Sequence, residues 1–232
     1  MKLSIVIPVF NEKNTILEVL KRVEAVVLPL GKEIILVDDC STDGTREMLK
    51  SLPAEKYRIF YHDINQGKGA AVRLGFNQAS GDIIIVQDAD LEYDPEEYGK
   101  LIKPIMDGKA DVVYGSRLIG GGETRRVLYF WHYLGNKLLT ILSNALSNLN
   151  LSDMETCYKV FSKASLEKIR PRLTSNRFGI EPEITMLIGR NKFKVYEVGI
   201  SYSGRTYKEG KKINWKDGLA AFWHIVKFGV RR

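Results

Sequence analysis

Carboxylates at alternate positions follow an apolar run in the segment 82–94. Asp88, Asp90 and Glu92 come shortly after Ile83–Val86, four apolar residues that predict a buried strand of a parallel sheet. Because alternate residues of an extended chain lie on one face, about 6.6 Å apart, the three side chains could converge on one hard divalent cation. Such a cation prefers oxygen ligands and also neutralises phosphates. We therefore predict a metal site at Asp88, Asp90 and Glu92; the alternative is a solvated acidic loop.

The elements that must position these carboxylates form an alternating pattern of short apolar runs and helical stretches. This alternation predicts βαβ units, an α/β fold and a mainly parallel sheet. We expect strands at 3–9, 34–37, 58–62, 83–86, 112–114, 158–161 and 194–202. We expect helices from residue 14, after the turn 41–44, and over 70–79, 126–148 and 182–190. The first helix should bury one face made of Ile16, Val19, Leu20, Val23 and Val27.

Composition indicates one ordinary globular domain rather than two, because 232 residues with 44% hydrophobic content can form one sizeable core. Two cysteines are too few for a disulfide framework or a paired zinc motif. We expect a cytosolic chain, because we find neither a signal peptide nor an apolar run of the roughly 18 residues that a membrane span needs. The net charge of +7 indicates an anionic partner. A nucleic acid is disfavoured, because the basic residues do not gather with stacking aromatics.

Further candidate residues follow the other predicted strands. Ligands of open α/β sheets bind at the carboxyl ends of the strands. Phe10 could cover a nucleobase or join the core, and Asp39 could bind a base or ribose or begin a helix. Arg117 could donate a fork of hydrogen bonds to a phosphate or form a surface salt bridge.

Five motifs follow one another along the chain: IVIPVFNE at 5–12, ILVDDCSTDGT at 35–45, NQGKGAA at 65–71, QDAD at 87–90 and GSR at 115–117. This ordered set resembles family 2 glycosyltransferases of the GT-A fold, and within that family the dolichol-phosphate mannose synthase branch. The resemblance implies a GT-A, Rossmann-like fold and an inverting transferase that uses a nucleotide-sugar donor, GDP-mannose or UDP-glucose, with Mg²⁺ or Mn²⁺.

The resemblance also implies roles for individual residues. The donor site comprises Pro8, Phe10, Glu12, Val37, Asp39, Lys68, Asp88, Ala89, Asp90, Arg117, Arg205 and Lys211. Relatives often carry Gln where Glu92 stands. The segment 202–212 resembles the family's mobile basic loop, in which Arg205 and Lys211 match phosphate contacts. A loop of this kind can close over a diphosphate and exclude water. We assign catalysis to Asp90, Arg117, Arg205 and Lys211.

The need for a general base depends on the acceptor. A phosphomonoester has its second pKa near about 6, so it is largely a dianion at neutral pH and can attack without losing a proton. A sugar hydroxyl would need a base, for which the candidates are Asp153, Glu181 and Glu183. Either glutamate could instead cap the helix that follows Pro182. Both kinds of acceptor stay open at this point.

Two apolar stripes favour a lipid acceptor. One comprises Val127, Trp131, Leu134, Leu138, Ile141, Ala145 and Leu149, widened by Leu128, Phe130, Leu139 and Leu142. The other comprises Trp215, Leu219, Phe222, Trp223, Val226 and Val230, with Lys216, Lys227, Arg231 and Arg232 around it. Tryptophans and cations on one helix are typical of a membrane interface. A terminal helix packed on the domain or on a dimer partner is the alternative.

These expectations combine into one functional hypothesis. Residues 1–213 would form a GT-A domain, with a nucleotide-binding half to about 120 and an acceptor half after it, and 214–232 an interfacial helix. The enzyme would transfer a hexose to a polyprenyl phosphate, as a peripheral protein on the cytoplasmic face of the membrane. The alternatives are transfer to a hydroxyl acceptor and a non-catalytic nucleotide-sugar sensor. A nucleotidyltransferase is disfavoured, because its Gly- and Arg-rich phosphate loop is absent from 8–12.

Overall fold

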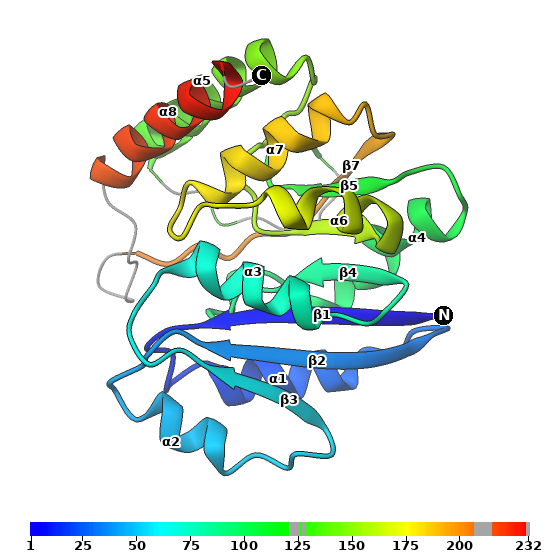
Figure 1. Cartoon of the computed structure of the whole chain (residues 1–232), viewed down its shortest axis with the longest axis vertical. Helices are drawn as coiled ribbons and strands as arrows, with labels where there is room; N and C mark the ends of the chain where they lie inside the picture. Colours follow the sequence, from blue (N-terminus) through cyan, green and yellow to red (C-terminus); the bar gives the residue numbers. More distant parts are fainter. Residues whose placement is uncertain (121–125, 127–128, 207–214, 231–232) are drawn as a thin grey trace.

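A seven-stranded sheet with helices on both faces forms the centre of the molecule (Figure 1). The computed structural model describes residues 1–120, 126, 129–206 and 215–230. The strand order is β3-β2-β1-β4-β6-β5-β7. Every neighbouring pair is parallel except the two that involve β6. The predicted α/β fold with a mainly parallel sheet is therefore confirmed.

The first half alternates strands and helices in the expected way. Its elements are β1 (Lys2–Val9), α1 (Ile16–Ala25), β2 (Gly31–Asp38), α2 (Thr45–Lys50), β3 (Tyr57–Tyr61), α3 (Lys68–Gln78) and β4 (Ile83–Val86). The β4 run is fully buried because strands lie on both sides of it and helices cover the sheet. One prediction for α1 was wrong. Val27 is 93% exposed, because the helix ends at Ala25 and Val26 is already extended.

The second half completes the sheet and adds helices beyond it. Its elements are η1 (Pro95–Glu97), α4 (Tyr98–Met106), β5 (Val112–Ser116), α5 (Phe130–Ser147), β6 (Lys159–Ser162), α6 (Lys163–Ile169), η2 (Arg170–Arg172), α7 (Ile180–Arg190), β7 (Val195–Gly199) and α8 (Trp215–Val230). The helices α4 and α6 were not predicted, and the strand expected over 194–202 ends at Gly199. None of the helices in the described part of the chain combines the length and apolar character needed to cross a bilayer.

The antiparallel strand β6 brings a second chain segment to the functional edge of the sheet. It pairs with β4 so that Ile83 faces Ser162 and Ile85 faces Val160. The start of β6 therefore lies beside the carboxyl end of β4. As a result, the segment 152–158, which precedes β6, enters the edge where the parallel strands end.

Two glycines set how α3 approaches this edge. A Cβ on Gly75 would lie 2.2 Å from Val6 Cγ1, so only glycine lets the helix pack this closely on β1. Gly67 precedes the helix at φ +101°, a conformation that side chains disfavour. Together they place Lys68, the first residue of α3, at the carboxyl edge.

Candidate functional site

A cavity of about 770 Å³ opens where the parallel strands end. Nearly all of the predicted donor-site residues line it, although they are distant in the sequence. The lining includes Pro8, Phe10, Glu12, Asp39, Lys68, Asp88, Ala89, Asp90, Glu92, Arg117 and Arg205. Val37 is fully buried in β2 and is not among the described lining residues. Lys211 lies outside the described residues.

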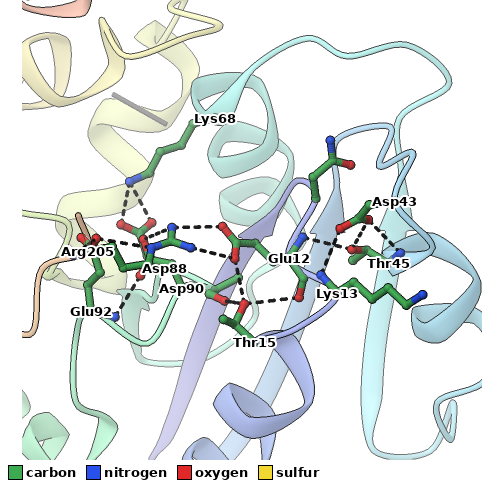
Figure 2. A network of polar contacts seen from close by, with 12 residues as sticks. Glu12, Lys13, Thr15, Asp43, Thr45, Lys68, Asp88, Asp90, Glu92 and Arg205 are labelled. Carbon is green, nitrogen blue, oxygen red and sulfur yellow. Dashed lines mark hydrogen bonds and ion pairs between the residues drawn. The ribbon is translucent and has the colours of Figure 1, made fainter. Parts of the chain in front are cut away.

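Acidic side chains from two strand ends surround the guanidinium of Arg205 (Figure 2). Arg205 Nη2 lies 3.2 Å from Glu12 Oε1 and 3.2 Å from Asp90 Oδ2, and Nε lies 3.5 Å from Glu92 Oε1. Burial, with the nearby carboxylates of Asp88 and Glu92, raises the pKa of Asp90 to about 7 although Arg205 lowers it. A cation among these carboxylates therefore favours their ionised forms, and in this structure Arg205 supplies it.

Glu92 also anchors the start of the basic segment. Its Oε2 accepts a hydrogen bond from the Tyr202 hydroxyl at 2.7 Å, and its Oε1 accepts one from the Arg205 backbone N–H at 2.8 Å. The Ser203 N–H donates to the Glu92 carbonyl oxygen at 2.9 Å. These contacts hold the segment against the carboxylate motif.

Thr15 joins the end of β1 to the segment after β4. Its hydroxyl lies 2.7 Å from Glu12 Oε2 and 2.7 Å from the carbonyl oxygen of Ala89. The Glu12 N–H in turn donates to Thr45 Oγ1 at 3.0 Å (Figure 2). Glu12 is thus held from the starts of the first two helices, which fixes one side of the carboxylate cluster.

Asp88 faces a different cation from Asp90. Lys68 Nζ lies 2.8 Å from Asp88 Oδ1 (Figure 2). It also lies 3.8 Å from Glu181 Oε1. Burial opposes the charge of the lysine, but Asp88 and Glu181 raise its pKa well above the ordinary value. Lys68 therefore stays protonated and places a positive charge in the cavity.

Asp39 holds the turn 65–67, which precedes α3. Its Oδ1 lies 2.7 Å from His62 Nδ1 and accepts from the Gln66 N–H at 2.9 Å, and its Oδ2 accepts from the Asn65 side chain at 2.9 Å and the Gly67 N–H at 2.7 Å. The side chain still lines the cavity. This structure thus adds a positioning role to the nucleotide contact predicted for Asp39.

Arg117 forms a buried ion pair instead of a surface salt bridge. Its Nε lies 2.7 Å from Asp153 Oδ2 and its Nη2 donates to Oδ1 at 2.8 Å. The guanidinium also lies over the Tyr202 ring, 5.1 Å from the centroid. Arg117 is therefore fixed in orientation at the cavity wall.

The three acids considered as general bases are all engaged in internal contacts. Asp153 is fully buried against Arg117, and Glu181 contacts Lys159. Glu183 accepts from the N–H groups of Thr174 and Ser175 at 2.9 and 2.8 Å. None of the three is among the described residues that line the cavity.

The oxygen donors of the cluster fit a hard divalent cation in their chemistry. Glu12, Asp90 and Glu92 already converge on one positive group, which is the arrangement that a cation of this kind needs. In the described part of the chain no three acidic, His or Cys side chains are placed to ligate a metal as they stand. A metal ion would therefore have to take over the position of Arg205, and Asp88 would have to turn from Lys68.

Sequence reasoning missed several lining residues. Glu155 precedes β6, and Arg177 and Phe178 come from the loop before α7. The first turns of α5 contribute Tyr129, His132, Tyr133 and Asn136. The one signal that could have singled out Glu155 is its position as a second acid two residues after Asp153, just before the predicted strand 158–161.

The chain has a mainly parallel sheet whose carboxyl edge gathers acidic and basic side chains, and ligands of open α/β proteins bind at this edge. The chain belongs to glycosyl transferase family 2, whose family model matches residues 4–170. It is 30% identical over 214 residues to the dolichol-phosphate mannosyltransferase of Pyrococcus furiosus, covering 91% of this chain and 59% of that protein. It therefore spans under two thirds of that relative's length.

Two further similarities concern a full-length relative and a solved structure. The chain is 26% identical over 239 residues to the UDP-N-acetylglucosamine–dolichyl-phosphate N-acetylglucosaminyltransferase of Methanococcus voltae, covering 96% of this chain and 94% of that one. Its fold resembles glucosyl-3-phosphoglycerate synthase from Mycobacterium tuberculosis in complex with Mn²⁺, UDP and phosphoglyceric acid. The TM-score is 0.74 at 18% identity, covering 100% of this chain and 79% of that one. The GT-A-like fold implied by the resemblance is thereby confirmed.

Proposed function

We propose that this family 2 glycosyltransferase is an inverting, metal-dependent enzyme that transfers a hexose from a nucleotide sugar to a polyprenyl phosphate. The observation that carries the proposal is the cluster of Glu12, Asp90 and Glu92 around one cationic group, beside the two fixed cations Lys68 and Arg117. Mg²⁺ or Mn²⁺ bound at Asp88, Asp90 and Glu92 would supply Lewis acid stabilisation of the departing diphosphate.

The chain's own residues bind and orient the donor. The nucleoside lies against Phe10 and Asp39 at the ends of β1 and β2, and the diphosphate lies at the end of β4. Lys68 offsets charge on the diphosphate from one side, and Arg205 moves from the carboxylates to the phosphate when the donor arrives. Phe10 is 36% exposed, so its ring is accessible to a base. Lys211 is assigned to the same phosphate contact.

The engagement of the three candidate bases supports a phosphate acceptor. Asp153, Glu181 and Glu183 each have fixed partners, and none of the three is among the described residues that line the cavity, so none is placed to take a proton from a hydroxyl. A phosphomonoester needs no such group, because it is already largely a dianion at neutral pH. The names of two relatives, which include dolichol or dolichyl phosphate, agree with this choice.

The neighbouring helices α5 and α8 support docking on a membrane surface (Figure 1). The part of α5 that is buried includes the polar residues Thr140, Ser143 and Ser147, whereas large apolar side chains point to solvent. The most exposed of these side chains are Phe130, Trp131, Leu138 and Ile141 on α5 and Leu219, Phe222, Trp223 and Val230 on α8. We propose that these side chains, which we call the apolar docking face, insert into the cytoplasmic surface of a membrane and bring the polyprenyl phosphate to the cavity.

The domain assignment follows from this proposal. Residues 1–213 form the transferase domain and 214–232 the interfacial helix. Of this predicted helix, the structure describes 215–230, and Arg231 and Arg232 lie outside the described residues. The predicted contributions of Val127, Leu128 and the side chains of Trp215 and Lys216 also lie outside them.

A donor-by-acceptor screen tests the proposal. GDP-mannose, UDP-glucose and UDP-N-acetylglucosamine are each incubated with a polyprenyl phosphate or a soluble sugar acceptor, with Mg²⁺, Mn²⁺ or EDTA. We expect one donor to release its nucleoside diphosphate only with the lipid phosphate and a divalent metal, with inverted anomeric configuration in the product. Release of the nucleoside diphosphate only with the soluble sugar would favour a hydroxyl acceptor. Binding of a donor without any release of nucleoside diphosphate would indicate a non-catalytic sensor.

A further inference from the structure

Glu155 is an acidic residue of the cavity wall that the transfer mechanism above does not use. It lies in the segment 152–158, which enters the carboxyl edge of the sheet because β6 is antiparallel. Its side chain is partly exposed, whereas its Oε1 is buried and has no hydrogen-bond partner among the described residues. A buried carboxylate oxygen without a partner is costly, so a ligand that donates a hydrogen bond here is stabilised.

The residues around Glu155 hold its backbone in place, but none of those described donates a hydrogen bond to its Oε1. Asp153 is paired with Arg117, and the Met154 N–H donates to Thr140 Oγ1 at 3.2 Å. The Thr156 hydroxyl donates to the carbonyl oxygen of Gly115, and the Cys157 N–H donates to the Tyr93 hydroxyl at 3.0 Å. The backbone on both sides of Glu155 is therefore fixed, and the carboxylate is presented to the cavity from a rigid segment.

The local charges restrict what can bind there. The nearby cations are already engaged, Arg117 with Asp153 and Lys159 with Glu181. Burial, together with Glu181, raises the pKa of Glu155 to about 7, although Lys159 lowers it. A phosphate beside this carboxyl group would add a further negative charge. A neutral hydroxyl, in contrast, can donate a hydrogen bond to it.

The strand order indicates which part of a donor reaches Glu155. Along the carboxyl edge the order is β2, β1, β4, β6 and β5. Asp39 and Phe10 therefore lie at one end, and Asp88 and Asp90 lie in the middle. Glu155 precedes β6 and lies beyond them, next to Met154, whose N–H contacts Thr140 of α5. A nucleotide sugar laid along this edge, with its nucleoside over β1 and β2 and its diphosphate at β4, places its hexose at Glu155.

We propose that Glu155 accepts a hydrogen bond from a hydroxyl group of the donor's hexose and thereby helps to determine which sugar is bound. This inference rests on the proposed donor site, but it assigns a sugar contact that the cluster around Arg205 does not provide. A site built to bind a hydroxyl discriminates strongly against an analogue that lacks it. Glu155 is a specificity-determining residue in this sense, and not a general base.

Calorimetric titration with sugar nucleotides tests the contact directly. The ligands are UDP-glucose, GDP-mannose, their analogues that lack one sugar hydroxyl, and UDP and GDP alone, all with MnCl₂. The proteins are the wild type, Glu155→Ala, Glu155→Gln and the exposed control Glu96→Ala. We expect Glu155→Ala to lower the affinity for the preferred sugar nucleotide by about tenfold to hundredfold, the effect of losing a hydrogen bond to a charged group.

The analogues distinguish a direct contact from a structural effect. One deoxy analogue should bind the wild type more weakly than the full sugar nucleotide does, by the same factor. Glu155→Ala should bind this analogue and the full sugar nucleotide with equal affinity, because the two changes remove the same hydrogen bond. Glu155→Gln, which keeps one acceptor oxygen, should recover part of the affinity. UDP and GDP should bind equally to all four proteins. The inference would be overturned if, for every analogue, the losses of binding free energy from the missing hydroxyl and from Glu155→Ala simply added. Weaker binding of the free nucleotides to Glu155→Ala would also overturn it.

A transfer assay on the same proteins separates this inference from the proposed function. Coupling between Glu155 and one hydroxyl in a wild-type protein that transfers sugar to no acceptor would contradict the transferase proposal and leave the contact established. Normal transfer to polyprenyl phosphate with unchanged sugar selectivity in Glu155→Ala would contradict the contact alone. A wild-type protein that binds no sugar nucleotide would contradict both.

Discussion

Single acidic residues at the sheet edge serve two purposes, and their partners distinguish these purposes. Asp39 and Asp153 are satisfied by fixed internal partners and position a turn and an arginine. Asp90 instead faces Asp88, Glu92 and the cation of Arg205 inside the cavity. The carboxylates that crowd one another are the ones suited to hold an incoming cation, because bringing them together is unfavourable without one.

Asp90→Ala should abolish turnover and leave the fold intact. If a metal held at Asp90 contributes several kcal/mol to the stabilisation of the leaving diphosphate, its loss lowers kcat on the order of 10³-fold. Removing one of several neighbouring carboxylates should not lower the melting temperature. Activity and thermal unfolding are compared with Asp63→Asn, an exposed control. A collapsed thermal transition in Asp90→Ala would indicate a structural role instead.

Arg205→Ala should make the protein's stability depend on divalent metal. Without the guanidinium, Glu12, Asp90 and Glu92 lose their shared cation, so the melting temperature should fall by a few degrees. MnCl₂ should then restore it and should stabilise this variant more than the wild type, because ligands that bind the folded state stabilise it. The exposed control Lys13→Ala should behave like the wild type. An equal response to MnCl₂ in both proteins would contradict a shared site.

At the scale of elements, the contact of α3 with β1 determines where Lys68 and the preceding turn 65–67 lie. The contact depends on the absence of a side chain at Gly75. The helix cannot move away to make room, because its first turn packs against the loop 174–177. There, a Cβ on Gly69 would lie 2.5 Å from the Ser175 carbonyl oxygen.

Gly75→Ala should destabilise the protein by about 1–3 kcal/mol, the usual cost of overpacking a buried contact. The matched control is Gly99→Ala in α4, where a new Cβ meets nothing within 4 Å. That substitution should stabilise the protein by up to about 1 kcal/mol, because alanine has a higher helix propensity than glycine. Chemical denaturation measures the free energy of unfolding of both variants. If the two substitutions changed it equally, the packing of α3 against Val6 would have room for a side chain at residue 75.

The two faces of α8 should respond differently to substitution. Trp223 is 64% exposed on the apolar docking face, whereas Ile225 is fully buried against α5 and α7. Trp223→Ala should lower binding to anionic phospholipid vesicles about tenfold with little change in melting temperature. Ile225→Ala should cost about 3 kcal/mol of stability and leave vesicle binding unchanged in the folded protein. Unchanged vesicle binding in Trp223→Ala would contradict docking through this face.

At the scale of the whole molecule, the two ends of the sheet have different tasks. The carboxyl ends carry the cavity, whereas Glu33 near the amino ends joins several elements. Its carboxylate accepts hydrogen bonds from Lys2 Nζ at 3.1 Å and the Ser80 N–H at 2.7 Å, and contacts the Ser4 hydroxyl and Arg58. Three neighbouring strands and the turn before β4 are therefore tied together by one side chain.

Glu33 should make the free energy of unfolding depend on pH. Burial acts to raise the pKa of Glu33, but hydrogen bonds from Ser4, Ser80 and Lys2 lower it from 4.5 to about 2. The ionised form therefore stabilises the folded state above about pH 4.5, and this contribution is lost as the pH falls toward 2. Glu33→Gln should cost roughly 1 kcal/mol at pH 7 after allowance for solvent screening, and less at pH 3.

Denaturation curves between pH 3 and pH 7 measure this difference. The exposed residue Glu47 provides the control, and Glu47→Gln should follow the wild type at every pH. If the deficit of Glu33→Gln were the same at pH 3 and pH 7, the ionised carboxylate would not be the source of the stability.

The sequence by itself determined the family, the alternation of the first four strands with helices, and a set of residues most of which line the cavity. Local patterns suffice there, because each strand end carries its own polar residues and parallel strands end at one edge. Arg205 was assigned to phosphate, but its place among Glu12, Asp90 and Glu92 depends on residues up to 193 positions apart. The exposure of Val27 and the helices α4 and α6 were likewise misjudged or missed.

Only the tertiary structure decided which acids are free to act. Asp153, Glu181 and Glu183 are acids in suggestive positions of the sequence, yet each is neutralised or hydrogen-bonded by a group from another element. Glu155 looked unremarkable and is the one left without a partner at Oε1 among the described residues. The physical reason is that the environment of a charge is set by contacts across the sheet edge, which neither residue type nor local spacing encodes.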